Sequence, residues 1–340
     1  MWYCGAKVRS LVAAVLLLGL ALGSTQSRAA VQYTLIDLGT LGGTNSFAHG
    51  INARGQVVVE SRTVGNTAFR ASLWESGVMT DLGTLGGTNS VARGINERGQ
   101  VVGDSAVGGN TAIHASLWEN GLITDLGTLG GTNSFARGIN EHGQVVGDSR
   151  IAGNTAFHAS LWENGLITDL GTLGGQNSVA FGINARGQVV GDSQIAGNTA
   201  IHAFLSENGV MTDLGTLGGT NSSAHGINAR GQVVGQSQIA GNTAIHAFIW
   251  EKGVMTDVGT LGGTNSAARG INERGDVVGN SQTAGNTANH AVLWENGLIT
   301  DLETLGGING LARGINERGD VVGQSQTAGN TAIHAVLWER

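Results

Sequence analysis

Six histidines recur at a fixed spacing of 44 residues, and they are the first residues in this chain that suggest chemistry. They are His114, His158, His202, His246, His290 and His334. Imidazoles repeated in this way could form a ring of metal ligands or contact a bound ligand. The first repeat carries Arg70 at this position, which interrupts a metal ring. A structural network is the simpler interpretation, in which each histidine bonds to side chains equivalent to Ser105, Trp118 and Asp125.

Carboxylates repeat at a second position, but the last three repeats lose them. The residues are Glu60, Asp104, Asp148 and Asp192 in the first four repeats, and Gln236, Asn280 and Gln324 in the others. Although amide oxygens also bind calcium, a required set of calcium ligands would not be diluted in three repeats of seven. We therefore predict no metal site and no cofactor.

Two sets of asparagines stand in predicted loops and are the candidate ligand-facing residues. The connections between repeats carry Asn45, Asn89, Asn133, Asn177, Asn221, Asn265 and Asn309. The loops between the second and third predicted strands carry Asn66, Asn110, Asn154, Asn198, Asn242, Asn286 and Asn330. Both sets would lie on one face, where seven weak pockets acting together can raise avidity by about 10² to 10⁴. Turn formation explains the same residues without a ligand.

Tryptophan also recurs once in each repeat, with Ser206 as the exception in the fourth. The residues are Trp74, Trp118, Trp162, Trp250, Trp294 and Trp338. Their rings could stack on sugars, or they could fill the core between repeats. Loss of a core aromatic residue costs about 3 to 5 kcal/mol. If the rings are core, Ser206 predicts a weak fourth repeat.

These residues all belong to one repeat of 44 residues. The heptapeptide Asp-Leu-Gly-Thr-Leu-Gly-Gly begins at Asp37 and returns, with small changes, at Asp81, Asp125, Asp169, Asp213, Asp257 and Asp301. Each unit reads as four short strands. In the second unit these strands span residues 90–96, 100–105, 114–118 and 122–126. Asn120-Gly121 between two apolar runs predicts a hairpin turn, and a period of about 40 to 45 residues is typical of a propeller blade.

The ends of the repeated region favour a closed ring over an open β-solenoid. Residues 33–340 make up seven units, but the seventh ends at Arg340 without its last strand. Residues 33–36 supply that strand from the other end of the chain. Closure protects strand edges that a solenoid would cover with distinct capping repeats. The sequence therefore predicts an all-β, seven-bladed β-propeller closed by its N-terminal strand, with small residues on the innermost strands.

Residues 1–30 have the features of a secretory signal peptide. Lys7 and Arg9 precede an apolar stretch, residues 11–22, that is too short to span a bilayer. Small residues near the end of the segment predict cleavage after Ala29 or Ala30. We expect a secreted or periplasmic protein with one propeller domain over residues 31–340. An uncleaved membrane anchor is the alternative.

Cleavage would change the charge and the cysteine content of the chain. It removes Cys4, the only cysteine, so the mature chain forms no disulfide. It leaves 15 basic residues against 25 acidic ones, and Lys252 is then the only lysine. Such a chain lacks the basic surface of a nucleic-acid-binding or membrane-binding protein. We expect a monomer with no nucleic-acid partner and no integral membrane anchor after cleavage.

The order of motifs resembles a known bacterial family. The pattern Gly-Ile-Asn-x-x-Gly-Gln-Val-Val-Gly precedes His-Ala-Phe at residues 202–204 and 246–248, and the heptapeptide follows. This order is similar to that of the bacterial extracellular repeat family named for the tripeptide, the HAF repeat, over residues 33–340. Other units depart from the tripeptide, as at Ser116 and Val292. The resemblance implies an exported bacterial protein and leaves its activity open.

Catalysis requires a unique cluster of groups, whereas this chain copies its polar residues seven times. The departures from the repeat are Val59, Arg70, Gln176, Phe181, Ser206, Glu303, Ile308 and Gly310. Those of the fourth and seventh units lie three blades apart. We therefore expect no enzyme and no catalytic residue. We expect an exported module that binds an extracellular glycan or protein or interacts with a surface, and the seven repeats would allow it to bind multivalently. The alternatives are a lyase or glycosidase that uses the central channel and a purely structural extracellular protein.

Cleavage of the leader is tested by the mass of the exported protein. When the full chain is expressed in a secreting bacterium, the exported form should begin at Ala30 or Val31, because signal peptidase reads small residues before the cut. Intact-mass spectrometry of the exported fraction measures this. A matched chain with Ser27→Asp and Ala29→Asp should keep its leader. An exported wild-type chain that retains residues 1–30 would contradict the prediction.

Overall fold

Each 44-residue unit folds as four antiparallel strands joined by tight turns. In the second unit these are β6 (Gly86–Ile95), β7 (Val101–Val107), β8 (Ile113–Glu119) and β9 (Leu122–Asp125). Asn120 takes a φ of 52° between β8 and β9, a left-handed conformation that asparagine tolerates. The predicted hairpin turn is therefore present, and the four predicted strands differ from the observed ones by a few residues at their ends.

A computed structural model describes Met1 and residues 32–340. Residues 33–340 form one unit, and the fold given below is that of this unit. The predicted signal peptide and its cleavage site lie outside the described residues. Among the described residues, no helix has the length and apolar character that crossing a membrane requires.

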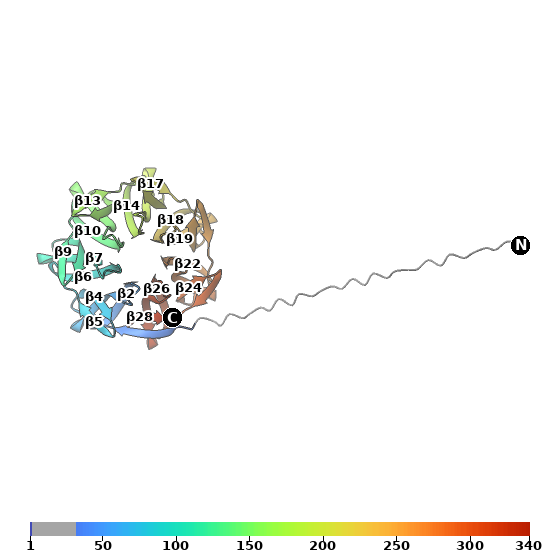
Figure 1. The fold of residues 1–340 in the computed structure, drawn as a ribbon, viewed down its shortest axis with the longest axis horizontal. Coiled ribbons are helices and arrows are strands. Elements are labelled where there is room, and N and C mark those ends of the chain that lie inside the picture. The colour runs from blue at the N-terminus through green and yellow to red at the C-terminus, as the bar shows by residue number, and fades with distance from the viewer. Residues whose placement is uncertain (2–31) are drawn as a thin grey trace. The chain divides into compact units, whose positions relative to one another are not determined.

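The unit contains seven four-stranded sheets, which are the blades of a β-propeller. The first strands are β2 (Gly42–Ile51), β6, β10 (Gly130–Ile139), β14 (Gly174–Ile183), β18 (Gly218–Ile227), β22 (Gly262–Ile271) and β26 (Gly306–Ile315). The second strands are β3 (Val57–Thr63), β7, β11 (Val145–Ile151), β15 (Val189–Ile195), β19 (Val233–Ile239), β23 (Val277–Thr283) and β27 (Val321–Thr327). The first strands lie nearest the centre of the ring, as Figure 1 shows.

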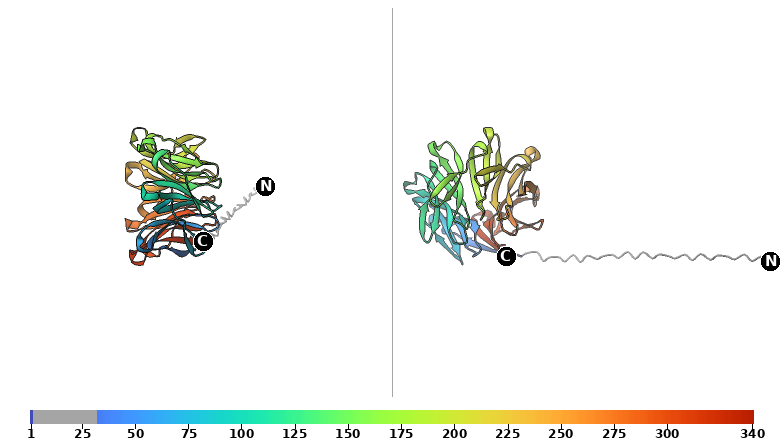
Figure 2. Two further views of the ribbon diagram at one scale, coloured as in Figure 1. Left: turned by 90° about the vertical axis from the view of Figure 1, so that its left-hand side faces the viewer. Right: turned by 45° about the horizontal axis from the view of Figure 1, so that its top comes forward.

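The outer half of each blade completes the sheet. The third strands are β4 (Phe69–Glu75), β8, β12 (Phe157–Glu163), β16 (Ile201–Glu207), β20 (Ile245–Glu251), β24 (Asn289–Glu295) and β28 (Ile333–Glu339). The outermost strands are β5 (Val78–Asp81), β9, β13 (Leu166–Asp169), β17 (Val210–Asp213), β21 (Val254–Asp257), β25 (Leu298–Asp301) and, in the seventh blade, β1 (Thr34–Gly39). Seen edge on in Figure 2, the blades stack side by side around the ring. The predicted seven-bladed propeller is confirmed.

The N-terminal strand closes the ring. β1 pairs antiparallel with β28, in a register that sets Thr34 opposite Glu339 and Ile36 opposite Leu337. It therefore supplies the strand that the seventh blade lacks, as the sequence predicts. A side-chain contact adds to the ladder, because Asp37 Oδ2 lies 2.8 Å from Nδ1 of His334.

Adjacent blades touch backbone to backbone around the axis. A Cβ built on Gly94 would lie 3.3 Å from the carbonyl oxygen of Arg137 in the next blade. The equivalent glycines of the other blades meet the next carbonyl at 2.8 to 3.3 Å. Contacts this short disfavour any side chain at these positions. The prediction that small residues suit the innermost strands therefore has its reason in this close approach.

Seven asparagines of the Gly-Ile-Asn motif join each blade to the next. Nδ2 of Asn96 donates to the backbone oxygen of Asn140 at 3.1 Å, and Asn316 closes the ring by donating to Asn52 at 3.2 Å. The set is Asn52, Asn96, Asn140, Asn184, Asn228, Asn272 and Asn316, with distances of 3.0 to 3.3 Å. These side chains are at most 4% exposed. They form an inter-blade ring that the sequence analysis did not identify.

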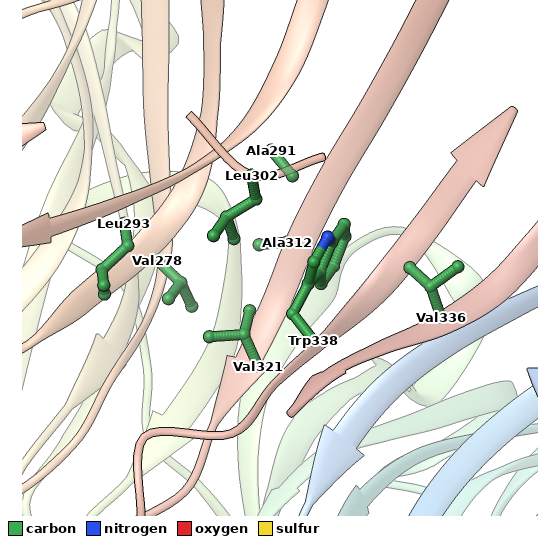
Figure 3. Packing of buried hydrophobic residues seen from close by; sticks show 8 residues of the cluster. All are labelled: Val278, Ala291, Leu293, Leu302, Ala312, Val321, Val336 and Trp338. Carbon is green, nitrogen blue, oxygen red and sulfur yellow. The ribbon is translucent and has the colours of Figure 1, made fainter. Parts of the chain in front are cut away.

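The core lies between the blades, in seven hydrophobic clusters that each join two neighbours. Tryptophan is central to several of them. Trp118, Trp162, Trp294 and Trp338 are at most 6% exposed, and Figure 3 shows the ring of Trp338 in the cluster between the sixth and seventh blades. These tryptophans are core residues, and the alternative of a sugar-stacking platform does not apply to them.

The fourth blade has a buried serine where the other blades have tryptophan. Ser206 is itself buried, and Phe204, two residues earlier, is fully buried in the cluster between the third and fourth blades. The first three blades have serine at the position of Phe204. The fifth blade packs both Phe248 and Trp250 in the equivalent cluster. Phe204 therefore does not take the place of the missing ring, and the weakness of the fourth repeat stays a prediction.

Closure predicts a loss of stability when β1 is removed. A chain that begins at Thr40 loses the β1–β28 ladder and the side chain of Leu38, which is 6% exposed. Full burial of one such side chain contributes about 1.5 to 3 kcal/mol, so the melting temperature should fall by at least roughly 2 to 5 °C relative to a chain that begins at Gln32. Differential scanning calorimetry measures the shift.

Strand complementation provides the control for this truncation. A peptide of residues 32–39 added in excess to the truncated chain should recover part of the loss, whereas a scrambled peptide should not. Equal melting temperatures for the two chains would show that pairing with β28 contributes nothing to stability.

Candidate functional site

The first candidate set, the asparagines between repeats, binds the backbone of the preceding blade. Oδ1 of Asn89 accepts a hydrogen bond from the backbone N–H of Phe69 at 2.9 Å. All seven members make this contact at 2.9 Å. The serine that follows each of the first six acts in the same way, as when Ser90 accepts from the N–H of Ala71. This set therefore serves as a clamp between blades.

The second candidate set stands in the turns between the second and third strands. These asparagines have φ values of 56° to 58°. Their side-chain oxygens each accept a hydrogen bond from a backbone N–H near the start of the first strand of the same blade. In the second blade Asn110 accepts from the N–H of Thr88 at 2.7 Å. The seven distances run from 2.7 to 2.9 Å. The side-chain carbonyl oxygens of both candidate sets are thus used in hydrogen bonds that stabilise the fold.

The six repeated histidines each pair with one aspartate. His114 Nδ1 lies 2.7 Å from Asp125 Oδ2, and the six pairs span 2.5 to 2.8 Å. In the first blade Arg70 stands 3.8 Å from Asp81 in the same arrangement. Trp118 does not join this network, because its Nε1 is buried without a hydrogen-bond partner among the described residues. Among residues 32–340 no three histidine, aspartate or glutamate side chains group as metal ligands would.

A cavity of about 280 Å³ opens on the axis of the propeller. One side chain from the innermost strand of each blade lines it, at the position just before the close-packed glycine. These seven residues, which we call the axial ring, are His49, Arg93, Arg137, Phe181, His225, Arg269 and Arg313. Although the chain is acidic overall, it therefore places four of its arginines around one small cavity.

Carboxylates of the second strands neutralise one part of the axial ring. Arg93 Nε lies 2.8 Å from Asp104 Oδ1, and Arg137 Nε lies 2.6 Å from Asp148 Oδ1. Both aspartates are buried, and burial raises their pKa values against the opposing effect of the arginines. In the first blade Glu60 Oε2 is 3.5 Å from Nε2 of His49. The position that loses its acid in the last three repeats is therefore the one behind the axial ring.

The two histidines of the axial ring are neutral at ordinary pH. Burial lowers the pKa of His49 to about 4 and that of His225 to about 3. The neighbouring arginines add to the effect, because a second positive charge disfavours protonation. The fixed positive charge of the ring therefore comes from its arginines.

A second hollow lies between the fourth and fifth blades. Ser223, where other blades carry alanine or larger apolar residues, lines it together with Asp192 and Gln236. Ser223 Oγ donates to Asp192 Oδ2 at 2.8 Å and lies 3.3 Å from Nε2 of His225. Burial raises the pKa of Asp192, and its contact with Ser223 opposes this shift. These contacts connect the hollow to the axial ring.

Sequence reasoning missed the axial ring and Ser223. It identified Phe181 as a departure but did not connect it with the residues 44 positions away, which vary in type. A spacing of 44 was the available signal, since His49, Arg93 and Arg137 precede equivalent glycines. The direction in which these side chains point was not evident, because it depends on how seven separate strands meet at the axis.

No protein-family model matches this chain, and no curated protein sequence matches it at a significant level. The resemblance to the HAF repeat therefore rests on the motifs alone.

Solved structures share the fold. The β-propeller domain of the trilobed protease from Pyrococcus furiosus, described as having an open velcro topology, is 12% identical, with a TM-score of 0.56 over 86% of this chain and 95% of that one. The acylaminoacyl peptidase of Pyrococcus horikoshii is 10% identical, with a TM-score of 0.52 over 86% of this chain and 51% of that one. At such identities the likeness shows the β-propeller fold alone.

The lowered pKa of His49 predicts a loss of stability in acid. Its ordinary pKa is 6.5, so the unfolded chain takes up a proton before the folded chain does, and folding is penalised as the pH falls through about 6.5 toward 4. Between about pH 7 and pH 5, protonation of this one group should lower the free energy of unfolding by about 2 kcal/mol. Urea unfolding at the two pH values should show a smaller loss for His49→Gln than for the wild type.

His142 provides the control, because it lies on an exposed turn. His142→Gln should leave the pH dependence of the wild type unchanged. Identical dependence in the wild type and His49→Gln would contradict the prediction.

Proposed function

We propose that this protein is an exported, non-catalytic binding module whose ligand occupies the axial cavity. The observation that supports this function is the axial ring itself. There the seven blades contribute arginine, histidine and phenylalanine to one concave surface, whereas the loops repeat the same asparagines. A concave site with a few convergent polar groups is the usual form of a ligand site.

An extracellular glycan or protein is the proposed partner, in keeping with the predicted export. Contacts with a large partner would extend beyond the cavity to the repeated turns. Six aliphatic side chains stand 64 to 73% exposed at equivalent hairpin turns, namely Val78, Leu122, Leu166, Val210, Val254 and Leu298. Repeated exposed groups of this kind support a multivalent form of the binding, in which weak contacts add to avidity.

A hydrolase is the second candidate, because of one pair of residues. Ser223 Oγ lies 3.3 Å from Nε2 of His225, whose Nδ1 is 2.9 Å from the carbonyl oxygen of Ala268. This is the contact that a serine nucleophile makes with a general base. Two features disfavour it: Ser223 donates to Asp192 instead, and a histidine with a pKa of about 3 is a weak base at neutral pH.

A glycan array and an extracellular-protein array, run beside a hydrolase, lyase and glycosidase panel, test these functions together. Phe181→Ala should weaken binding about tenfold or more, because an aromatic side chain in a pocket often dominates affinity. Phe157→Ala is the matched control, since Phe157 packs on Phe135 outside the cavity.

The outcomes separate the candidates. Binding that depends on Phe181, with no turnover, supports the proposed function. Specific turnover that is lost in Ser223→Ala would overturn it in favour of the hydrolase. Absence of both binding and turnover would overturn it in favour of a purely structural protein.

A further inference from the structure

We propose that the axial cavity is an anion site, in which Arg269 and Arg313 hold a carboxylate or phosphate group of the ligand. This inference rests on the binding function proposed above, and it names the chemistry of the group that enters the cavity. It follows from a comparison of equivalent arginines within the same ring.

The four arginines of the axial ring occupy equivalent places but have different neighbours. Arg93 and Arg137 each contact an aspartate eleven residues further along the chain. The residues eleven positions after Arg269 and Arg313 are Asn280 and Gln324. Two arginines thus lie in ion pairs, whereas the other two have a neutral amide at the equivalent position of the second strand.

No ion-pair contact compensates the charge of Arg269 or Arg313 among the described residues, and among carboxylates only Glu60 acts on the charge of Arg313, from beyond ion-pair distance. Arg269 Nη1 is 3.4 Å from Nε2 of the neutral His225, and Arg313 Nη2 donates to Gln324 Oε1 at 3.2 Å. Both Nε groups are buried without a hydrogen-bond partner within residues 32–340. Neither arginine forms an ion pair with any residue of that range.

Electrostatics favours an anion between these two guanidinium groups. Burial lowers the pKa of both arginines, to about 10 for Arg313, whose charge the nearby Arg269 also disfavours. A partly buried, unpaired cation is costly, and a charge-assisted hydrogen bond to an oxyanion offsets that cost. Guanidinium forks match the geometry of carboxylate and phosphate groups.

The rest of the cavity is compatible with such a group. Asp104 and Asp148 accept hydrogen bonds from their own arginines, which reduces their repulsion of an anion. Phe181 supplies an apolar surface for the uncharged part of the ligand, to which the acidic group is attached. A cavity of about 280 Å³ is near the lower end for small-molecule sites, so it admits one small acidic group.

Isothermal titration calorimetry of the propeller with inorganic phosphate and with D-glucuronate tests the inference, and glucose serves as the uncharged match for glucuronate. At least one anion should bind with a dissociation constant of about 1 mM or tighter, and glucose should not. The phosphate and glucuronate arms distinguish the two sources of the oxyanion. Absence of binding by both anions would overturn the inference.

Asn280→Asp/Gln324→Asp is the decisive variant. It keeps both arginines and gives each the aspartate that Arg93 and Arg137 have, so anion affinity should fall at least about tenfold because the site is neutralised from within. The folded state should keep or raise its melting temperature. Arg186→Gln/Arg230→Gln makes the same change in net charge on exposed turns and should bind as the wild type does.

The two proposals fail in different ways. If an array ligand binds equally well to the wild type and to Asn280→Asp/Gln324→Asp, the binding function stands and the anion site is overturned. If phosphate or glucuronate binds through Arg269 and Arg313 while no array ligand is found, the anion site stands and the glycan or protein partner is overturned. Anion binding that survives unchanged in Asn280→Asp/Gln324→Asp would also overturn the inference.

Discussion

The close approach of the seven innermost strands is the constraint on which the rest of the structure depends. Each strand presents a glycine to the carbonyl group of the next, at a distance that leaves little room for a Cβ atom. At the same level the Asn52-type side chains bond blade to blade, and Asn316 returns to the first blade. Closure of this inter-blade ring holds the outer strands in place, and the tryptophan clusters then fill the wedges between blades.

The same constraint determines where ligand chemistry is possible. With glycine pressed against the neighbouring backbone, the residue before it is the one that faces the axis. Variation among blades at that position changes the lining of the cavity without disturbing the ring contacts. The repeated loops have less freedom, because Asn89-type and Asn110-type oxygens are already bonded to the backbone. The departures from symmetry therefore matter most at the axial ring.

Charge compensation behind the axial ring differs between the two halves of the propeller. Asp104 and Asp148 neutralise their arginines, whereas Asn280 and Gln324 leave theirs charged. The chain carries more acidic than basic residues, so this local excess of positive charge is a property of the arrangement and not of the composition. The net charge led us to expect no nucleic-acid partner, but it gave no indication of a basic site on the axis.

The repeat by itself determined the architecture. A period of 44 residues, Asn-Gly turns and the offset of residues 33–36 sufficed to predict seven blades and their closure by β1, because these are local signals of strand, turn and chain end. The axial ring depended on tertiary structure. Seven residues 44 positions apart, from His49 to Arg313, form one surface only when the strands converge, and the pairing of each arginine depends on which second-strand residue lies behind it. The spacing of motifs along the sequence reveals the repeat, whereas the site forms only through contacts between blades.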